Sequence, residues 1–334
     1  MVFATGKKLL SALLLSASLL AAAQAAGYAE HPLAQELMAE MRDEFGFTEE
    51  HLEQVFAQAR RQQSILDAIS RPAERVKPWR EYRPIFLTRQ RIDKGVEFWA
   101  ENEKALARAE KEYGVPAEFI VAIIGVETFY GGNTGRYAVL DALSTLAFDY
   151  PPRAPFFRGQ LKQFLLLTRE EQLDPASLKG SYAGAMGLPQ FMPGSFRAYA
   201  VDFNGDGRIN IWTDAEDAIG SVANYFIEHG WQPGQKVAVA ATLKDEQAEQ
   251  GLTGGLDPKH SMQELKAMGW QAEEKIPGKT RVTAFRFDGE QGAEYWLGLP
   301  NFQAITRYNR SEMYAMAVTQ LAQALAAEFK GNKQ

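Results

Sequence analysis

The spacing of apolar residues changes near residue 231 of this 334-residue chain, and this change constrains the fold most strongly. Before that point apolar side chains recur every three or four positions, as at Leu37, Met41 and Phe45, which is the spacing of amphipathic helices. Beyond it, short segments rich in β-forming residues alternate with glycines and prolines. The pattern therefore predicts a mainly helical α+β fold with a small β-rich insertion. Helices are expected over 31–45, 48–60, 89–113, 262–268 and 311–329, strand segments over 236–241, 280–287, 293–297 and 302–307, and a proline-broken connection over 71–88.

The composition excludes several classes of chemistry. Hydrophobic residues make up 46% of the chain and charged residues 23%, the balance of a globular protein. The net charge of −6 argues against nucleic acid as a partner. Because the chain contains no cysteine, it has no disulfide, thiolate nucleophile, cysteine-bound zinc or thioether lipid anchor. The four histidines are scattered, so we expect the chemistry to rest on carboxylates, hydroxyls and backbone groups.

The first 26 residues have the pattern of a cleavable export signal. Lys7 and Lys8 precede an apolar run that begins at Leu9, and small residues follow it up to Ala26. The run is shorter than the ~20 apolar residues that a membrane-spanning helix needs, and an uncleaved N-terminal anchor is the alternative. We therefore interpret residues 1–26 as a signal peptide and predict an exported, soluble protein.

Glu127 lies near the end of a strongly apolar segment that follows Pro116. It comes four residues after Ile123 and seven after Ile120, so a helix places it on the same face as these core residues. Burial raises the pKa of a carboxyl group and keeps it protonated near neutral pH, as a general acid requires. The pair Gly131–Gly132 is expected to end the helix and leave Glu127 beside an open cleft. The alternative is a structural glutamate that pairs with an arginine or caps a neighbouring helix.

A second segment, residues 180–195, reads GSYAGAMGLPQFMPGS and is rich in glycine and other small residues. Such residues let the backbone approach a ligand closely, and the interleaved Ser181 and Gln190 add polar side chains. These groups suit hydrogen bonding to sugar hydroxyls and N-acetyl groups. A compact loop packed on aromatic side chains is an equally good interpretation of this segment alone.

Short motifs in a fixed order link these segments to the rest of the chain. They read VETFYG at 126–131, GSYAGAMG at 180–187, QFMP at 190–193, NYF at 224–226, YN at 308–309 and YAMAV at 314–318. Together they closely resemble the lytic murein transglycosylase B family, and the resemblance covers nearly all of the chain beyond residue 26.

The resemblance implies a lysozyme-like core flanked by a helical domain and a small β-rich inserted domain. The helical domain is then expected to comprise residues 27–75 and about 145–176, and the β-rich domain residues 231–305. The lysozyme-like catalytic core would be assembled from residues 76–144, 177–230 and 306–334.

The resemblance also implies an activity. Family members cleave the β-1,4 bond between N-acetylmuramic acid and N-acetylglucosamine in peptidoglycan without adding water, because the muramic acid 6-hydroxyl attacks C1 and leaves a 1,6-anhydro end. Glu127 matches the family's single catalytic acid, which later acts as the base, and no cofactor is required for this chemistry. The positions that match the family's substrate cleft are Tyr82, Ser181, Gln190, Tyr225, Tyr308, Asn309 and Tyr314.

The residues themselves agree with a mechanism that needs one carboxylate. A conventional glycosidase uses two, ~5–5.5 Å apart when it retains configuration and ~6.5–9.5 Å apart when it inverts. Asp141 and Asp149 are the nearest candidates in sequence for a second one, and we interpret Asp149 as a turn residue before two prolines. An intramolecular hydroxyl removes the need for a base-activated water. A hydrolytic muramidase is the first alternative, and a non-catalytic wall-binding scaffold is the second.

Residues 202–210 read DFNGDGRIN, which is the first half of an EF-hand loop. Oxygen ligands at alternate positions, with a glycine at the sixth, let a chain wrap a hard cation such as Ca2+. The twelfth position holds Thr213 in place of the usual bidentate Glu, so we expect weak, structural binding. By the resemblance the last ligand is Asp217, with Asp214 and Glu216 as alternatives and a metal-free turn as the other interpretation. The expected ligands are Asp202, Asn204, Asp206, the carbonyl of Arg208, and Asp217.

These observations predict a periplasmic lytic transglycosylase that acts on peptidoglycan glycan strands. Many members of the family carry a lipoprotein cysteine after the signal, and this chain has none, so we expect a soluble form. We also expect a monomer whose other partners are proteins of cell-wall synthesis or turnover.

Overall fold

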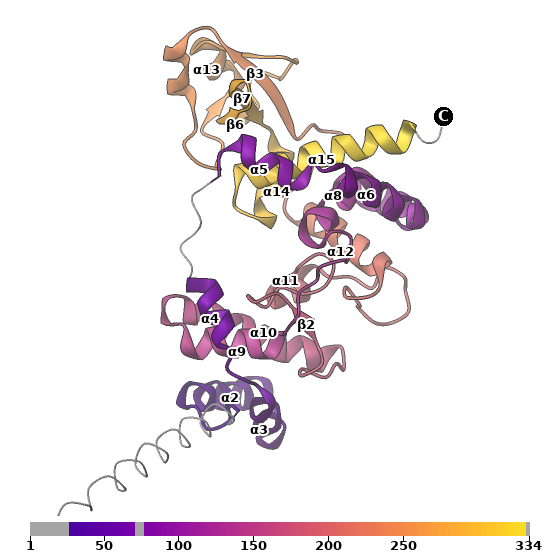
Figure 1. Ribbon diagram of the computed structural model, residues 1–334, viewed down its shortest axis with the longest axis vertical. Helices are drawn as coiled ribbons and strands as arrows, with labels where there is room; N and C mark the ends of the chain where they lie inside the picture. Colours follow the sequence, from indigo (N-terminus) through magenta and orange to yellow (C-terminus); the bar gives the residue numbers. More distant parts are fainter. Residues whose placement is uncertain (1–26, 71–76, 332–334) are drawn as a thin grey trace, which may run out of the picture. The chain divides into compact units, whose positions relative to one another are not determined.

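The computed structural model describes residues 27–70 and 77–331 of the chain (Figure 1). The predicted signal peptide, residues 1–26, lies outside the described residues. Contacts between residues divide the chain into two compact units. Unit 1 takes in the described residues up to position 70 with Gly135–Met186 and Gln190–Arg197. Unit 2 takes in the residues from 77 to Thr134, Gly187–Pro189 and the described chain from Ala198 onwards.

Unit 1 is built almost entirely of helices, and the first two form where the apolar spacing predicts them. In α2 (Pro32–Phe45) the fully buried Leu37 and Met41 lie on one face, and the helix ends at Gly46, which has a left-handed backbone. The side chain of Thr48 caps α3 (Glu49–Gln58). The later elements are α4 (Gln63–Ser70), β1 (Tyr137–Ala138), α9 (Val139–Asp149), a 3-10 helix (Pro151–Arg153), α10 (Ala154–Glu170), β2 (Lys179–Gly180) and α11 (Pro193–Tyr199), which begins in unit 1. The helical domain is expected to include about residues 145–176. Unit 1 contains the longer segment Gly135–Met186, in which α9 packs against α10 and also against α4.

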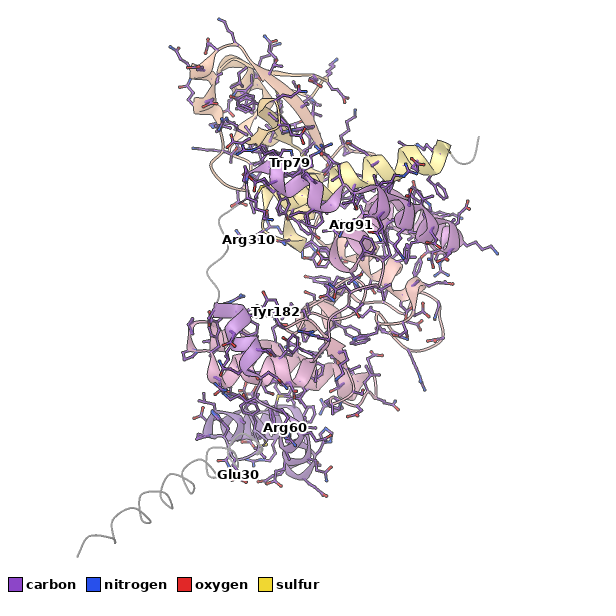
Figure 2. All side chains as sticks on the ribbon, viewed as in Figure 1. Glu30, Arg60, Trp79, Arg91, Tyr182 and Arg310 are labelled. Carbon is purple, nitrogen blue, oxygen red and sulfur yellow. The ribbon has the colours of Figure 1, made fainter. Side chains whose placement is uncertain are left out.

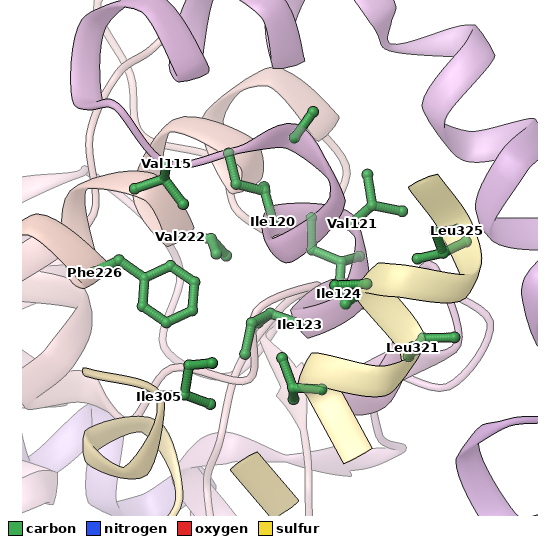
Figure 3. Packing of buried hydrophobic residues seen from close by; sticks show 14 of the residues in the cluster. Val115, Ile120, Val121, Ile123, Ile124, Val222, Phe226, Ile305, Leu321 and Leu325 are labelled. Atoms are coloured by element: carbon green, nitrogen blue, oxygen red, sulfur yellow. The ribbon is translucent and has the colours of Figure 1, made fainter. Parts of the chain in front are cut away.

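Unit 2 has a helical core centred on α8 (Ala117–Thr128), whose isoleucines are fully buried. Figure 3 shows Ile120, Ile123 and Ile124 among residues of other helices, including Phe226 and Leu321. α8 packs against α15 (Glu312–Gly331), the C-terminal helix that the sequence predicts. The other helices of this core are α5 (Trp79–Phe86), α6 (Arg89–Glu101), α7 (Glu103–Tyr113), α12 (Ala215–Glu228) and α14 (Pro300–Tyr308).

Two predictions about this core are wrong. The single helix expected over 89–113 is interrupted at Asn102, whose backbone leaves the helical conformation with φ of −113° and ψ of 21°. Its side-chain amide, at 2.8 Å, and its backbone amide, at 3.1 Å, both donate to the Phe98 carbonyl oxygen. The connection expected over 71–88 contains α5, because the buried Trp79 anchors this helix (Figure 2). The Trp79 ring stacks on Phe287 with ring centres 4.8 Å apart.

The β-rich part of unit 2 is a five-stranded antiparallel sheet in the order β4-β6-β7-β3-β5. The hairpin of β6 and β7 pairs Phe285 with Trp296, and Trp270 and Leu297 are fully buried in a small separate core. The strands are β3 (Ala238–Leu243), β4 (His260–Ser261), β5 (Trp270–Ala272), β6 (Arg281–Gly289) and β7 (Gly292–Gly298), with a 3-10 helix (Glu246–Gly251) and α13 (Met262–Ala267) between them.

The predicted strand at 302–307 is wrong, because this segment lies in α14. Pro300 opens the helix, and Phe302 and Ile305, three residues apart, are fully buried. The contacts place the β-rich residues and the helical core in one unit, so the boundaries predicted at 231 and 305 stay a prediction. Among the described residues, no helix has both the length and the apolar character needed to cross a membrane.

Candidate active site

Glu127 lies in the last turn of α8, one and two turns after the fully buried Ile123 and Ile120. Its side chain is only half-buried, so the carboxyl group lies at the edge of the core. The hydroxyl of Tyr314, on α15, donates a hydrogen bond to Glu127 Oε1 at 2.5 Å. Burial raises the pKa of Glu127 to about 7, and the Tyr314 hydrogen bond opposes this rise. The carboxyl group is therefore able to release and to take up a proton near neutral pH.

The end of α8 differs from the prediction. The helix ends at Thr128 and not at the glycine pair, because the next two residues, Phe129 and Tyr130, have left-handed backbones with φ of 54° and 60°. Residues other than glycine are strained in this conformation, and they keep it only where the surrounding structure fixes their position. Here two glycines, one on α6 and one on α8, leave the space in which the Tyr130 side chain packs. A Cβ added at Gly95 or Gly125 would come within 2.3 Å or 2.5 Å of Tyr130 Oη, so the Tyr130 ring occupies the space that these glycines leave.

Two further side chains fix the turn beside Glu127, and the sequence analysis did not identify either. Thr128 Oγ1 lies 3.0 Å from the Leu188 carbonyl oxygen and accepts a hydrogen bond from the Gly131 amide at 3.1 Å. Arg91, labelled in Figure 2, donates from Nε to the Gly125 carbonyl oxygen at 3.1 Å. Its guanidinium group also lies 5.0 Å from the centre of the Phe129 ring. The turn after Glu127 is thus held from α6 as well as from α8.

Of the four predicted cleft tyrosines, three interact with Glu127 in unit 2, and the fourth, Tyr225, lies beside one of them. Burial, and after it the charge of Glu127, raises the pKa of Tyr82, Tyr308 and Tyr314, so all three hydroxyls lie within electrostatic reach of the carboxylate. Tyr308 donates to the Pro189 carbonyl oxygen at 2.7 Å. The Tyr225 ring lies 4.6 Å from the Tyr308 ring, and its hydroxyl donates to the Arg307 carbonyl oxygen at 2.7 Å. These tyrosines come from α5, α12, α14 and α15.

The other predicted residues have different surroundings. Asn309 is exposed and ends α14 next to Tyr308. Ser181 and Gln190 belong to unit 1, where Ser181 Oγ accepts a hydrogen bond from the Ala185 amide at 3.0 Å and stabilises its own glycine-rich turn. Gln190 has a left-handed backbone with φ of 52°. The assignment of these three residues to substrate stays a prediction.

Both candidates for a second carboxylate already have partners inside unit 1. Asp141 accepts hydrogen bonds from the Arg60 amide and from Gln62 Nε2, each at 2.8 Å. Asp149 is the last residue of α9 and accepts a hydrogen bond from the Tyr28 hydroxyl. These contacts give both aspartates a structural role in unit 1.

The loop at 202–210 is wrapped around its own acidic side chains. Asp202 Oδ1 and Oδ2 accept hydrogen bonds from the Gly205 and Gly207 amides, both at 2.8 Å. Asn204 Oδ1 accepts from the Asp206 amide at 2.8 Å, so the loop curls with its oxygen atoms turned inwards. Both glycines have positive φ, as such tight curvature requires.

Asp217 closes this loop from α12. It is fully buried, and its two carboxylate oxygens accept hydrogen bonds from the Phe203 amide at 2.8 Å and the Asn210 amide at 2.7 Å. Burial raises the pKa of Asp217, against the effect of these hydrogen bonds. Asp214, an alternative last ligand, instead caps α12 by accepting from the Glu216 amide at 2.8 Å. Across the described ranges, no group of three or more histidine or acidic side chains is placed to hold a metal ion, so a bound ion would need amide and carbonyl oxygens as well.

Comparison with known proteins identifies the family. Residues 29–323 match the model of the transglycosylase SLT domain. The chain is 48% identical over 308 residues to the membrane-bound lytic murein transglycosylase B of Escherichia coli K12, covering 90% of this chain and 84% of that protein.

Solved structures of relatives have the same fold. The catenated lytic transglycosylase SltB1 of Pseudomonas aeruginosa matches with a TM-score of 0.89 and 62% identity over 90% of this chain and 99% of that one. The Escherichia coli lytic transglycosylase Slt35 in complex with calcium matches with a TM-score of 0.84 and 47% identity over 91% and 95% of the two chains. SltB3 of Pseudomonas aeruginosa in complex with NAG-NAM-pentapeptide matches with a TM-score of 0.77 and 30% identity over 89% and 80%. The chain therefore belongs to the lytic murein transglycosylase B family, within the transglycosylase SLT domain proteins, and has their mainly helical, lysozyme-like α+β fold.

Proposed function

We propose that this lytic transglycosylase of peptidoglycan uses Glu127 as its only acid and base. The observation that carries the proposal is the Glu127 carboxyl group at the end of α8, which burial gives a pKa near 7 and which accepts a hydrogen bond from Tyr314. A group with this pKa is present in both protonation states at neutral pH, as one residue that acts first as acid and then as base requires.

In the first step, protonated Glu127 gives its proton to the glycosidic oxygen between N-acetylmuramic acid and N-acetylglucosamine as the bond to C1 breaks. Because Tyr314 donates to Oε1, the proton is delivered from Oε2. In the second step the muramic acid 6-hydroxyl bonds to C1 and loses its proton to the Glu127 carboxylate. The product is a 1,6-anhydromuramic acid end, and no water is consumed.

The hydrolytic alternative needs a second carboxylate to activate water or to act as nucleophile. Among the described residues of unit 2, burial and the Tyr314 hydroxyl account for the shifted pKa of Glu127, and no acidic neighbour contributes to it. The two candidates in unit 1, Asp141 and Asp149, have partners there. The tyrosines near Glu127 instead provide hydroxyl groups that suit an N-acetyl group and the charge that develops on the sugar ring.

Mass spectrometry of muropeptides released from purified sacculi tests this proposal. We expect products that are one water lighter than those of a muramidase and that end in 1,6-anhydromuramic acid. The Glu127→Gln variant should bind sacculi but release no product, because an amide of the same volume donates no catalytic proton. Reducing-end products would instead establish a hydrolase, and binding without cleavage by the unmodified protein would establish a wall-binding scaffold.

We also propose that the 202–210 loop binds a structural Ca2+ ion. The inward-turned oxygens of Asp202, Asn204 and Asp206 are the hard donors that this ion prefers, with the Arg208 carbonyl and Asp217 completing the set. When bound, the ion would neutralise the acidic loop and take no part in the reaction. Calcium at 100 times its Kd should stabilise the metal-stripped protein by about 2.7 kcal/mol. A melting temperature that stays constant through a calcium titration would contradict this assignment.

The site of action follows from the substrate. Peptidoglycan lies in the cell envelope, and we propose that this chain reaches the periplasm through cleavage of residues 1–26 and works there as a soluble monomer. N-terminal sequencing of the exported protein and its mass in solution test these two points. Proteins of cell-wall synthesis or turnover are the proposed partners, and co-purification from envelope extracts would identify them.

A further inference from the structure

Unit 2 contains a cavity of about 790 Å³ that the proposed reaction does not use. Its lining residues come from the end of α12, the start of α14 and the β-rich part. Its volume is in the range of ~300–1,000 Å³ that is typical of small-molecule sites. The lining residues that matter here are His229, Lys275, Ile276, Arg281 and Leu299.

The walls of this cavity are fixed by hydrogen bonds inside the protein. Asn301 is fully buried, and its Nδ2 donates to the carbonyl oxygens of Gln232 at 2.9 Å and of Gln235 at 2.8 Å. On another side, the Met262 amide donates to the Thr280 carbonyl oxygen at 2.9 Å and ties the 276–280 segment to α13. A ligand would therefore enter a cavity that is already formed, which lowers the cost of ordering it on binding.

The cavity is positively charged in an acidic protein. Lys236, Lys275 and Arg281 line it together with a single acidic residue, Glu274, which pairs with Lys236. Among the described residues neither Lys275 nor Arg281 forms an ion pair, although the charge of Arg281 also acts on the nearby Glu264 carboxylate. The Arg281 guanidinium group donates to the carbonyl oxygen of Pro258, another lining residue, at 3.0 Å. Two positive charges are thus available to an anionic ligand.

Apolar groups form the rest of the lining. Val239, Ile276 and Leu299 contribute aliphatic surface, and three prolines extend it. A small inorganic anion would leave this surface unused. The combination favours a ligand with an extended organic body and a free carboxylate, such as a short peptide.

Neighbouring aromatic rings lead from this cavity towards the surroundings of Glu127. The His229 ring, on the cavity wall, stacks on Tyr225 with ring centres 3.9 Å apart, and Tyr225 lies 4.6 Å from Tyr308. Tyr308 in turn lies within electrostatic reach of Glu127. An extended pentapeptide spans up to ~17 Å, which is longer than these two ring-to-ring steps together.

We propose that this cavity binds the peptide stem of peptidoglycan, with Lys275 and Arg281 holding its terminal carboxylate. The proposal rests on the proposed function, because a stem is present only if the substrate is peptidoglycan. It assigns the β-rich part a role in selecting glycan strands that still carry peptides.

Calorimetric titration of two soluble probes tests this assignment. The probes are a NAG-NAM disaccharide that carries a pentapeptide and the same disaccharide without the peptide. We use the Glu127→Gln protein as the background so that no turnover occurs. The double variant Lys275→Ala/Arg281→Ala should bind the peptide-bearing probe about tenfold more weakly and the peptide-free probe with unchanged affinity. Lys266→Ala, an exposed lysine of the same β-rich part outside the cavity lining, is the matched control and should change neither affinity.

A salt series and a charge-reversal variant test whether the contact with the carboxylate is ionic. Raising the salt concentration should weaken binding of the peptide-bearing probe more than binding of the peptide-free one, because the carboxylate contact is ionic. Lys275→Glu should lower the affinity for the peptide-bearing probe further than Lys275→Ala does. Equal affinities for the two probes, or equal losses on both in the double variant, would overturn the assignment.

The failure of this inference can be distinguished from the failure of the proposed function. Formation of 1,6-anhydro ends from peptide-free glycan strands by the unmodified protein depends on Glu127 and not on the cavity. If those ends form while the double variant binds both probes normally, the cavity assignment alone is wrong. If no anhydro ends form from any glycan, the proposed function is wrong.

Discussion

Replacing Tyr314 by Phe should raise the pKa of Glu127 further and move the pH dependence of the reaction. In the structure two causes act on this carboxyl group, and they oppose each other. Burial favours the protonated form, while the hydrogen bond from the Tyr314 hydroxyl at 2.5 Å favours the ionised form. Tyr314→Phe removes the second cause and leaves the first almost unchanged, because phenylalanine fills nearly the same buried volume.

The size of the change follows from the strength of this hydrogen bond. A hydrogen bond to a charged group contributes ~1.5–3 kcal/mol, and one pKa unit corresponds to ~1.4 kcal/mol. The pKa of Glu127 should therefore rise by ~1–2 units from about 7. Since the acid form starts the reaction, the alkaline limb of kcat/KM should move to higher pH by ~1 unit or more. This shift is independent of any fall in the maximum rate caused by poorer orientation of the carboxyl group.

The measurement is kcat/KM for soluble glycan strands between pH 5 and 10, since this ratio reports the pKa of the free enzyme. Tyr130→Phe is the matched control, because Tyr130 is also near Glu127 in sequence but its buried hydroxyl has no hydrogen-bond partner among the described residues. In the Tyr130→Phe control, the alkaline limb of kcat/KM should stay at the same pH as in the unmodified protein. A limb that stays in place or moves to lower pH in Tyr314→Phe would refute the opposing effects of burial and the Tyr314 hydroxyl on the pKa of Glu127.

Two further predictions concern stability. Because the folded-state pKa of Glu127 is raised from 4.5 to about 7, the stability that its protonated form contributes is complete below pH 4.5 and is lost as the pH rises through 7. The free energy of unfolding in urea should therefore be the same for Glu127→Gln and the unmodified protein near pH 4, and up to ~3 kcal/mol higher for the variant at pH 8. Equal free energies of unfolding at both pH values would contradict this. Gly125→Ala should destabilise the protein by ~1–2 kcal/mol, because the new methyl group meets the Tyr130 ring and this overpacking exceeds the gain in helix propensity. In α10, a methyl group added by Gly159→Ala meets no atom within 4 Å, so this variant should stabilise the protein by ~0.5–1 kcal/mol. If both variants changed the stability in the same direction, the Tyr130 ring would not limit the space at Gly125.

Local sequence patterns predict a secondary-structure element correctly where the spacing of its apolar residues fits only one type of element. The helix that carries Glu127, and the position of Glu127 on the face of Ile120 and Ile123, follow from residue spacing alone. The same spacing cannot separate a helix from a strand in a short apolar run, and for this reason the strand predicted at 302–307 is wrong. Nor does it show the break at Asn102, where the side-chain and backbone amides share the Phe98 carbonyl oxygen as acceptor.

The chemistry of the site depends on contacts that no local pattern contains. Tyr314 is 187 residues away from Glu127 in the sequence, and only the packing of α15 on α8 brings its hydroxyl to the carboxylate. The resemblance to a family identifies Tyr314 as a cleft position, but the direction in which it shifts the pKa of Glu127 needs the structure. The left-handed pair Phe129 and Tyr130 is likewise invisible in the sequence, because neither residue type favours that conformation.

The strained turn and the unfavourable burial of Glu127 lie next to each other at the end of α8. The Tyr130 ring between Gly95 and Gly125 holds the left-handed turn at the residues that directly follow the last turn of α8. Glu127 stands in that last turn, where burial makes its ionised form unfavourable, so the fold is least stable in the protonation state that completes the first step. A carboxyl group relaxed into solvent would stabilise the protein at neutral pH, but its pKa would return towards 4.5 and it would rarely hold the proton that the glycosidic oxygen needs. The packing of α8 against α15 therefore supports the chemistry, since it buries Glu127 beside the Tyr314 hydroxyl.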